Sequence, residues 1–333
     1  MRAIVIETPA PIESQSLKLQ ALPDPEPGRG ELLVRVRRCG VCRTDLHVAE
    51  GDLAPHHPRI VPGHEVVGIV ERCGAGCTRF APGARVGIAW LRSTCGICRY
   101  CTAGHENLCP NATFTGWDHD GGYADLATVR EDFAYAIPDA IGDQEAAPLL
   151  CAGIIGYRAI RRAAVKPGST VGLYGFGGSA HLTLQVLKYW DCRVFVMSRG
   201  GRHRELAEEL GADWIGGAQE QPPAPLDAAI LFAPAGEIVP CAMAALDRGG
   251  VLAIAGIHLS AIPPLDYARH LFEERELRSV TANTRADGDE FMKLAGQIPI
   301  RTRTISLPLA EANRALLMLK HDELKGAAVL EVS

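Results

Sequence analysis

The spacing of apolar residues changes near residue 150 of this 333-residue chain. Before that point, short apolar runs are separated by Gly and Pro, which is typical of strands in an irregular β-rich domain. The runs are AIVIE (3–7), ELLVRVRRCGV (31–41), HEVVGIVERCG (64–74), ARVGIAW (84–90) and GGYADLATV (121–129). The first part of the chain is therefore predicted to be rich in β-structure.

Beyond residue 152, helical stretches alternate with short apolar runs. The runs at 170–175, 193–198, 227–233 and 250–256 predict strands, and the stretches at 179–190, 203–210 and 237–246 predict helices between them. This alternation predicts a parallel, doubly wound sheet, and hence an α/β protein. One more helix (310–320) and one strand (326–332) follow in the tail.

A glycine-rich turn, GFGGSA, lies between the first of these strands and its helix. In a dinucleotide-binding turn, Gly175 would permit the tight bend and Gly177 and Gly178 would let the backbone approach a pyrophosphate. The small Ala180 would let helix and strand pack closely. Phosphate would then lie at the positive end of the helix dipole. Packing alone is the alternative explanation, but the strand before the turn and the strand–helix series after it favour a nucleotide.

The next strand ends in Ser198 and Arg199, where a carboxylate would bind the ribose of NAD. A serine and an arginine at this point favour NADP(H) over NAD(H). A solvated basic loop is the alternative.

Eleven cysteines are many for a chain from a reducing compartment. Four of them occur within fifteen residues, at a spacing typical of metal binding: Cys95, Cys98, Cys101 and Cys109. Four thiolates suit tetrahedral zinc and leave no open coordination position, which predicts a structural site. A second set is dispersed and consists of Cys42, His64 and Cys151. Two thiolates and one imidazole match a catalytic zinc with a free fourth position, although Cys151 alone would be read as a small buried apolar residue.

Two carboxylates accompany the dispersed set. Asp45 would orient the ligating imidazole, and Glu65 would lie behind the ligands or act as a transient fourth ligand. The remaining cysteines lack ligand spacing and are interpreted as packing residues: Cys39, Cys73, Cys77, Cys192 and Cys241.

The composition argues against several classes of partner and location. A net charge of −5, spread along the chain, argues against nucleic-acid and membrane-surface partners. No apolar run reaches the roughly 18 residues of a membrane span, and the first residues lack a signal-peptide pattern. The expected location is the cytoplasm.

The segments GVCRTDLH, GHEVVGIVERCGAGC, the four-cysteine loop and GFGGSA, in this order, resemble the zinc-containing medium-chain alcohol dehydrogenases, most closely the microbial branch. The resemblance covers essentially the whole chain. It implies a GroES-like catalytic domain from residues 1–152 and 286–333, with a Rossmann domain at 153–285 inserted. It also implies a homodimer or homotetramer with two zinc ions per subunit.

By matching position, the resemblance implies that Thr44 takes the proton of the alcohol and that His47 ends the relay to solvent. Trp90 would wall the alcohol pocket, and Arg43 would lie near the pyrophosphate. Two departures stand out. Ala327 occupies a position where many members carry an arginine, and Ala49 and Leu53 replace tryptophans of ethanol-adapted members, which suggests a roomier pocket.

These features together predict hydride transfer between a primary or secondary alcohol and a nicotinamide cofactor, giving an aldehyde or ketone. Three alternatives stay open: a polyol dehydrogenase of the same family, a zinc and thiol redox sensor with a vestigial cofactor domain, and a zinc-free quinone reductase. The four-cysteine loop argues against the first, the spacing of Thr44 and His47 against the second, and the ligand set against the third.

Overall fold

The computed structural model describes residues 1–324 and 326–333, and the chain divides into two compact units. One unit combines residues 1–151 with 284–333, and the other comprises 152–283. These boundaries lie one and two residues from the expected ones. At the second boundary, Thr284 caps helix α9 (Arg285–Ala295), because its hydroxyl accepts a hydrogen bond from the backbone N–H of Asp287. The cap residue therefore belongs to the same unit as its helix.

A seven-stranded sheet forms the framework of the first unit, with the long strand β3 (Glu31–Val41) near its centre. The strand order is β16-β17-β3-β4-β5-β9, and β8 also pairs with β3. The other strands are β4 (Glu65–Cys73), β5 (Arg85–Ile88), β8 (Leu126–Arg130), β9 (Ala134–Ala136), β16 (Thr304–Pro308) and β17 (Ala327–Glu331). Because β17 pairs antiparallel with β3, the C-terminal segment completes a sheet that the N-terminal segment begins.

The register of β3 and β4 positions the residues just outside both strands. In this antiparallel pair Gly40 is opposite Glu65, and Cys39 is opposite Val66. The residues that follow β3 therefore meet the residues that precede β4, at one end of the sheet.

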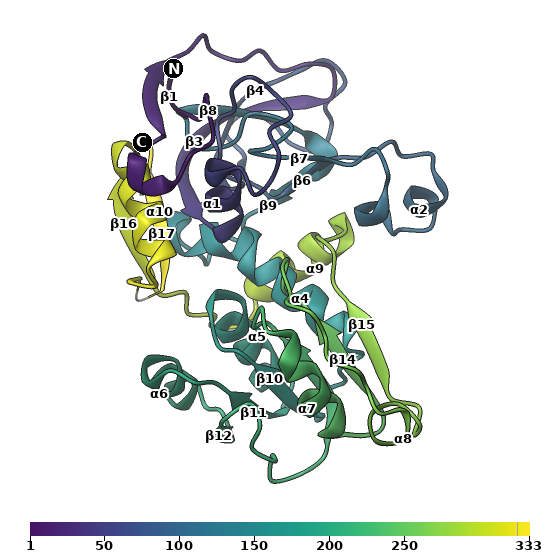
Figure 1. Ribbon diagram of the computed structural model, residues 1–333. Coiled ribbons are helices and arrows are strands. Elements are labelled where there is room, and N and C mark those ends of the chain that lie inside the picture. Colours follow the sequence, from purple (N-terminus) through teal and green to yellow (C-terminus); the bar gives the residue numbers. More distant parts are fainter. Residues whose placement is uncertain (325) are drawn as a thin grey trace. The chain divides into compact units, whose positions relative to one another are not determined.

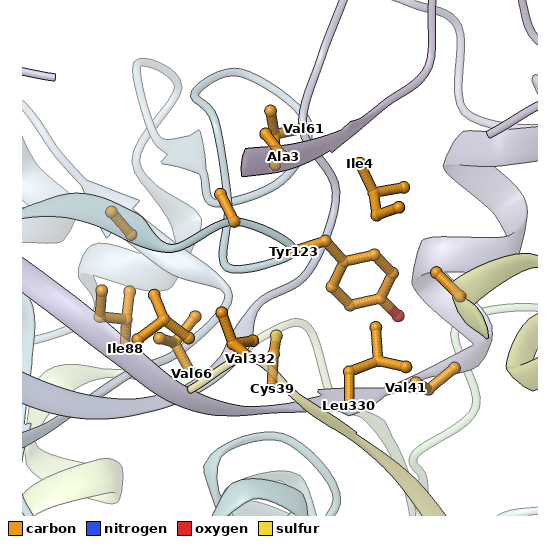
Figure 2. Close-up of a cluster of buried hydrophobic side chains, with 14 of the residues drawn as sticks. Ala3, Ile4, Cys39, Val41, Val61, Val66, Ile88, Tyr123, Leu330 and Val332 are labelled. Carbon is orange, nitrogen blue, oxygen red and sulfur yellow. The ribbon is translucent and has the colours of Figure 1, made fainter. Parts of the chain in front are cut away.

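Smaller elements surround this sheet. Two antiparallel pairs are formed by β1 (Arg2–Val5) with β2 (Lys18–Ala21) and by β6 (Leu91–Ser93) with β7 (Thr113–Phe114). The further helices are α1 (Arg43–Glu50), α2 (Arg99–Thr102), α3 (Asp143–Ala146) and α10 (Ala312–Lys320), the last of which lies beside β16 and β17 (Figure 1). Apolar side chains from β1, β3, β4 and the C-terminal strand meet in one buried cluster (Figure 2).

The second unit contains a six-stranded sheet in which every pairing is parallel. Its order is β12-β11-β10-β13-β14-β15, so the direction of winding reverses at β10. The strands are β10 (Thr170–Tyr174), β11 (Arg193–Met197), β12 (Trp214–Gly216), β13 (Leu226–Leu231), β14 (Leu246–Ile254) and β15 (Glu276–Ser279). The helices are α4 (Ala152–Arg162), α5 (Gly178–Tyr189), α6 (Gly201–Glu209), α7 (Val239–Ala244) and α8 (Tyr267–His270). A reversal point of this kind is where such sheets bind nucleotides, outside the carboxyl ends of the strands.

The α/β fold class is confirmed, and each predicted strand and helix has a counterpart near its expected position. Several further elements had no expectation from the apolar pattern, among them α1, α4 and α9. Of the helices in the described residues, none is both long and apolar enough to cross a membrane.

Candidate functional site

The four clustered cysteines lie on the segment between β6 and β7, and Cys98 precedes helix α2. Their sulfurs are close together: Cys95–Cys101 at 3.9 Å, Cys98–Cys101 at 3.5 Å and Cys95–Cys109 at 3.6 Å. Two thiolates on one tetrahedral zinc, each about 2.3 Å from the metal, lie roughly 3.8 Å apart. The donor set and its spacing therefore fit a closed zinc site.

The backbone of this loop also favours a thiolate at Cys95, whereas burial raises the pKa of Cys109 to about 11. The N–H of Cys98 points at the Cys95 sulfur at 3.4 Å, and the N–H of Cys95 points at the Cys109 sulfur at 3.5 Å. Hydrogen bonds from the backbone of Ile97 and Cys98 lower the pKa of Cys95 to about 6. At neutral pH Cys95 is thus largely in the form that binds metal.

The dispersed ligands converge at the end of the seven-stranded sheet. Cys42 follows β3 and precedes α1, His64 precedes β4, and Cys151 ends the first segment of the unit. Ligand atoms of these three residues and of Glu65 all lie within 4.8 Å of one another. The Cys42 and Cys151 sulfurs are 3.8 Å apart, again the separation expected for two thiolates on one zinc.

His64 supplies the clearest sign that this cluster fits a metal. Its side chain is 1% exposed, and its buried Nε2 has no hydrogen-bond partner among the described residues. A buried polar atom without a partner is costly, and a metal bond would satisfy it. The other ring nitrogen, Nδ1, lies 2.9 Å from Asp45 Oδ1. The pairing holds the ring with Nε2 free, because the proton remains on Nδ1.

Asp45 is the anchor of the ligand-bearing segments. Its carboxylate accepts hydrogen bonds from the backbone of Cys42 (2.8 Å) and of Gly63 (3.2 Å), besides the one from His64. Burial lowers the pKa of His64 and the neighbouring Asp45 charge raises it, so the carboxylate makes the imidazole a stronger base toward a metal. Asp45 is therefore placed to orient the imidazole, and this role stays a prediction.

A fourth hydrogen-bond donor to Asp45 was not expected from the sequence. The hydroxyl of Tyr123 donates to Asp45 Oδ2 at 3.3 Å from the loop before β8. Burial raises the pKa of Tyr123 well above its ordinary value, so the phenol keeps its proton. Tyr123 lies 78 residues from Asp45, and no local pattern in GGYADL indicates the contact.

Glu65 faces the same cluster from the first position of β4. Gly40 makes room for it, because a Cβ at Gly40 would lie 1.8 Å from Glu65 Oε2. Burial raises the pKa of Glu65 well above its ordinary value. A buried carboxyl within reach of the three ligand atoms is compatible with the fourth-ligand role.

The expected relay residues lie on helix α1. Thr44 Oγ1 is 3.8 Å from the Cys42 sulfur, which places the hydroxyl beside the ligand cluster. His47 Nδ1 is 2.7 Å from Asp52 Oδ2, a partner that was not expected from the sequence. Because α1 ends at Glu50 and Gly51 adopts a left-handed conformation, the chain turns back and brings Asp52 to His47. A histidine followed five residues later by an acid beyond a glycine cap is the signal that could have indicated this pair.

Two further expected residues lie close to these elements. The ring of Trp90 meets the ring of His64 edge to face, with centroids 5.1 Å apart, and stacks on Phe114 at 4.9 Å. Trp90 therefore borders the ligand cluster, as a pocket wall would. The Arg43 guanidinium donates a hydrogen bond to the Leu319 carbonyl at 3.4 Å, and this contact lies on the exposed surface of the same unit.

The glycine turn lies in the second unit, between β10 and α5, at the strand-order reversal. Gly175 has a φ of 86°, and a Cβ there would lie 2.8 Å from the Ala233 backbone nitrogen, so only glycine fits. At Gly177 and Gly178 a Cβ would meet open space, which leaves the backbone approachable. Ala180 is fully buried against the sheet. The turn therefore has the cradle that a pyrophosphate requires.

Ser198 and Arg199 follow β11 at the same edge of the sheet. Ser198 is buried, and its carbonyl accepts a hydrogen bond from Arg204 Nε at 2.7 Å. Arg199 is exposed and lines a cavity together with Gly217, Glu220 and Glu237. This cavity therefore combines one guanidinium with two carboxylates.

Comparison with known proteins places this architecture in a family. Residues 28–139 match the alcohol dehydrogenase GroES-like domain. The chain is 54% identical to "Probable alcohol dehydrogenase AdhA" of Mycobacterium tuberculosis (strain CDC 1551 / Oshkosh), over 99% of this chain and 97% of that protein. An alcohol dehydrogenase of Geobacillus stearothermophilus is 34% identical over the full length of both. The chain belongs to the zinc-containing medium-chain alcohol dehydrogenases.

Solved structures agree with this assignment. The thermostable alcohol dehydrogenase of Pyrobaculum aerophilum, determined with cobalt and zinc bound, superposes with a TM-score of 0.88 at 29% identity, covering 100% of this chain and 99% of that one. The expected family and reaction class are thus confirmed: the protein is an NAD(P)-dependent oxidoreductase of the zinc alcohol dehydrogenase type. The redox-sensor and polyol-dehydrogenase alternatives are not favoured.

Proposed function

We propose that the enzyme interconverts alcohols with aldehydes or ketones at the cluster of Cys42, His64 and Cys151, using NADP(H) in preference to NAD(H). The observation that carries the site assignment is the buried, unpartnered Nε2 of His64, aimed into two thiols that lie 3.8 Å apart. A zinc ion held by these three residues would supply Lewis acidity toward an alcohol or carbonyl oxygen. A second zinc ion, held by the four-cysteine loop, has a structural role because its ligand set is complete.

The chain's own residues move the proton. Thr44 accepts it from the alcohol hydroxyl and passes it on, because a hydroxyl both donates and accepts. His47 receives the proton at the end of the relay. The Asp52 carboxylate holds the Nδ1–H of His47, so Nε2 is the nitrogen free to accept it. A nicotinamide cofactor, when bound, would supply the acceptor for a hydride, one proton with two electrons, from the alcohol carbon.

The nucleotide is held in the second unit. The backbone amides of Gly177 and Gly178, at the start of α5, bind the pyrophosphate. Ser198 stands where a carboxylate would repel a 2′-phosphate, and the planar guanidinium of Arg199 can donate hydrogen bonds to that phosphate. A homodimer or homotetramer remains part of the proposal, to be tested by light scattering.

The reaction is tested by a panel of C2 to C8 and aromatic alcohols and aldehydes with each cofactor. Cys42→Ser should abolish turnover and leave the fold intact. Cys73→Ser is the matched control, because its sulfur donates to the Phe80 carbonyl, a contact that serine can keep. Absence of turnover across the panel, in wild-type protein that contains zinc, would contradict the proposal.

Cofactor preference is tested by binding. A charge-assisted hydrogen bond contributes about 1.5–3 kcal/mol, or roughly ten- to a hundredfold in affinity. Arg199→Ala should weaken NADPH by that factor and leave NADH unchanged, and Ser198→Asp should move the preference toward NAD(H). Equal affinity for both cofactors, unmoved by Arg199→Ala, would show that the arginine faces solvent.

A further inference from the structure

The phenol of Tyr123 is fully buried in the apolar core of the first unit. Figure 2 shows its ring among the side chains of Ile4, Val41 and Leu330. Phenylalanine would fill this space equally well, so packing explains the ring but not the hydroxyl. A buried hydroxyl requires a partner, and here the partner is Asp45 Oδ2 at 3.3 Å.

Tyr123 also contacts the turn that carries His64. Its backbone N–H donates to the Pro62 carbonyl at 3.0 Å, and Gly122 donates to the Gly63 carbonyl at 2.8 Å. The ring lies directly on Gly63, because a Cβ at that glycine would be 2.3 Å from Tyr123 Cδ1. The residue therefore touches the His64 turn with its backbone and ring, and the Asp45 carboxylate with its hydroxyl.

The four donors to Asp45 come from three parts of the chain. Cys42 donates to Oδ2 from the start of α1, and Gly63 and His64 donate to Oδ1 from the turn before β4. These donors lie on the same segments as the metal ligands, so they move together with them. Tyr123 is the donor from outside both segments, and it ties the carboxylate to the core.

We propose that Tyr123 is a positioning residue whose hydroxyl fixes the rotation of the Asp45 carboxylate. The carboxylate in turn fixes the direction of His64 Nε2. Tyr123 thereby sets how firmly the catalytic site retains zinc. The proposal rests on the zinc site of the proposed function. Residues that hydrogen-bond a metal-ligating histidine typically change metal affinity about 10–100-fold when they are removed. Tyr123 acts one bond further out, so its loss should accelerate zinc release about three- to tenfold.

The test uses the full-length enzyme with zinc bound and follows zinc transfer to a chromogenic chelator. Tyr123→Phe should release the catalytic-site zinc about three- to tenfold faster and leave release from the four-cysteine loop unchanged. Zinc release from Cys42→Ser, which retains the loop zinc, identifies which of the two kinetic phases belongs to the four-cysteine loop and which to the catalytic site. Tyr135→Phe is the matched control, because Tyr135 is also fully buried in this unit but lies on β9, outside the Asp45 contacts.

A spectroscopic readout separates positioning from general stability. With cobalt in the catalytic site, Tyr123→Phe should change the visible absorption, which follows ligand geometry, whereas Tyr135→Phe should leave it unchanged. Zinc release and cobalt absorption equal to those of wild type would overturn the proposal, as would equal acceleration from both sites. If the wild-type protein holds no zinc that Cys42→Ser removes, the proposed function fails together with this inference.

Discussion

Replacement of Asp45 by asparagine tests the anchor of the catalytic site with a change of almost no volume. The two carboxylate oxygens accept two hydrogen bonds each: Oδ1 from Gly63 and His64, and Oδ2 from Cys42 and Tyr123. An asparagine amide keeps one acceptor oxygen, and its NH₂ group then faces two former donors.

The structure indicates which way the amide would turn. With the amide nitrogen at the Oδ1 position, both Gly63 and His64 would lose their acceptor. With the nitrogen at the Oδ2 position, the Tyr123 hydroxyl can rotate and accept a hydrogen bond from the amide. Only the Cys42 N–H then loses its partner. One buried unsatisfied donor costs about 1–3 kcal/mol, which is the expected loss in the free energy of unfolding.

The effect on metal binding comes from the lost charge beside His64. A neutral amide holds the imidazole less firmly and makes it a weaker base, and changes of this kind lower metal affinity about 10–100-fold. Competition with a chelator of known zinc affinity measures this, and urea unfolding measures stability. Asp125→Asn is the matched control, because Asp125 accepts hydrogen bonds from Arg2 in the same unit but away from the ligands. Zinc affinity within twofold of wild type in Asp45→Asn would refute the anchoring argument.

Three further predictions concern the structural loop and the relay. Cys109→Ser should reduce the zinc content from two ions to one per chain by elemental analysis and lower the thermal midpoint, because it opens a closed site; unchanged zinc content would contradict the two-site interpretation. Thr44→Ala should slow turnover about 10²–10⁴-fold while Thr44→Ser retains most of it, because only a hydroxyl can pass the proton. Asp52→Asn should slow alcohol oxidation less than His47→Gln does. Added buffer base should restore the rate of both variants. Wild-type rates in Thr44→Ala and His47→Gln together would exclude the relay.

Local patterns were sufficient where the chemistry itself is local. The four cysteines of the loop lie within fifteen residues, so their spacing alone indicated a shared metal. The strand, glycine turn and helix that begin the second unit follow one another directly, and α5 begins one residue from its expected start. Helix α9 has no expectation from the apolar pattern, although Thr284 and Asp287 form a capping box at its start.

The chain's own sequence determined the family and the fold class, and it predicted the metal ligands and the nucleotide turn, since each depends on residue types at short and regular intervals. Tertiary structure alone decided which distant groups meet. Cys42 and His64 become neighbours because Gly40 is opposite Glu65 in the register of β3 and β4, and Cys151 reaches the Cys42 sulfur across 109 residues. The Tyr123–Asp45 bond likewise depends on how a core loop packs against a turn. Such contacts leave no periodic signal, because they result from strand register and core packing, which are properties of the whole unit.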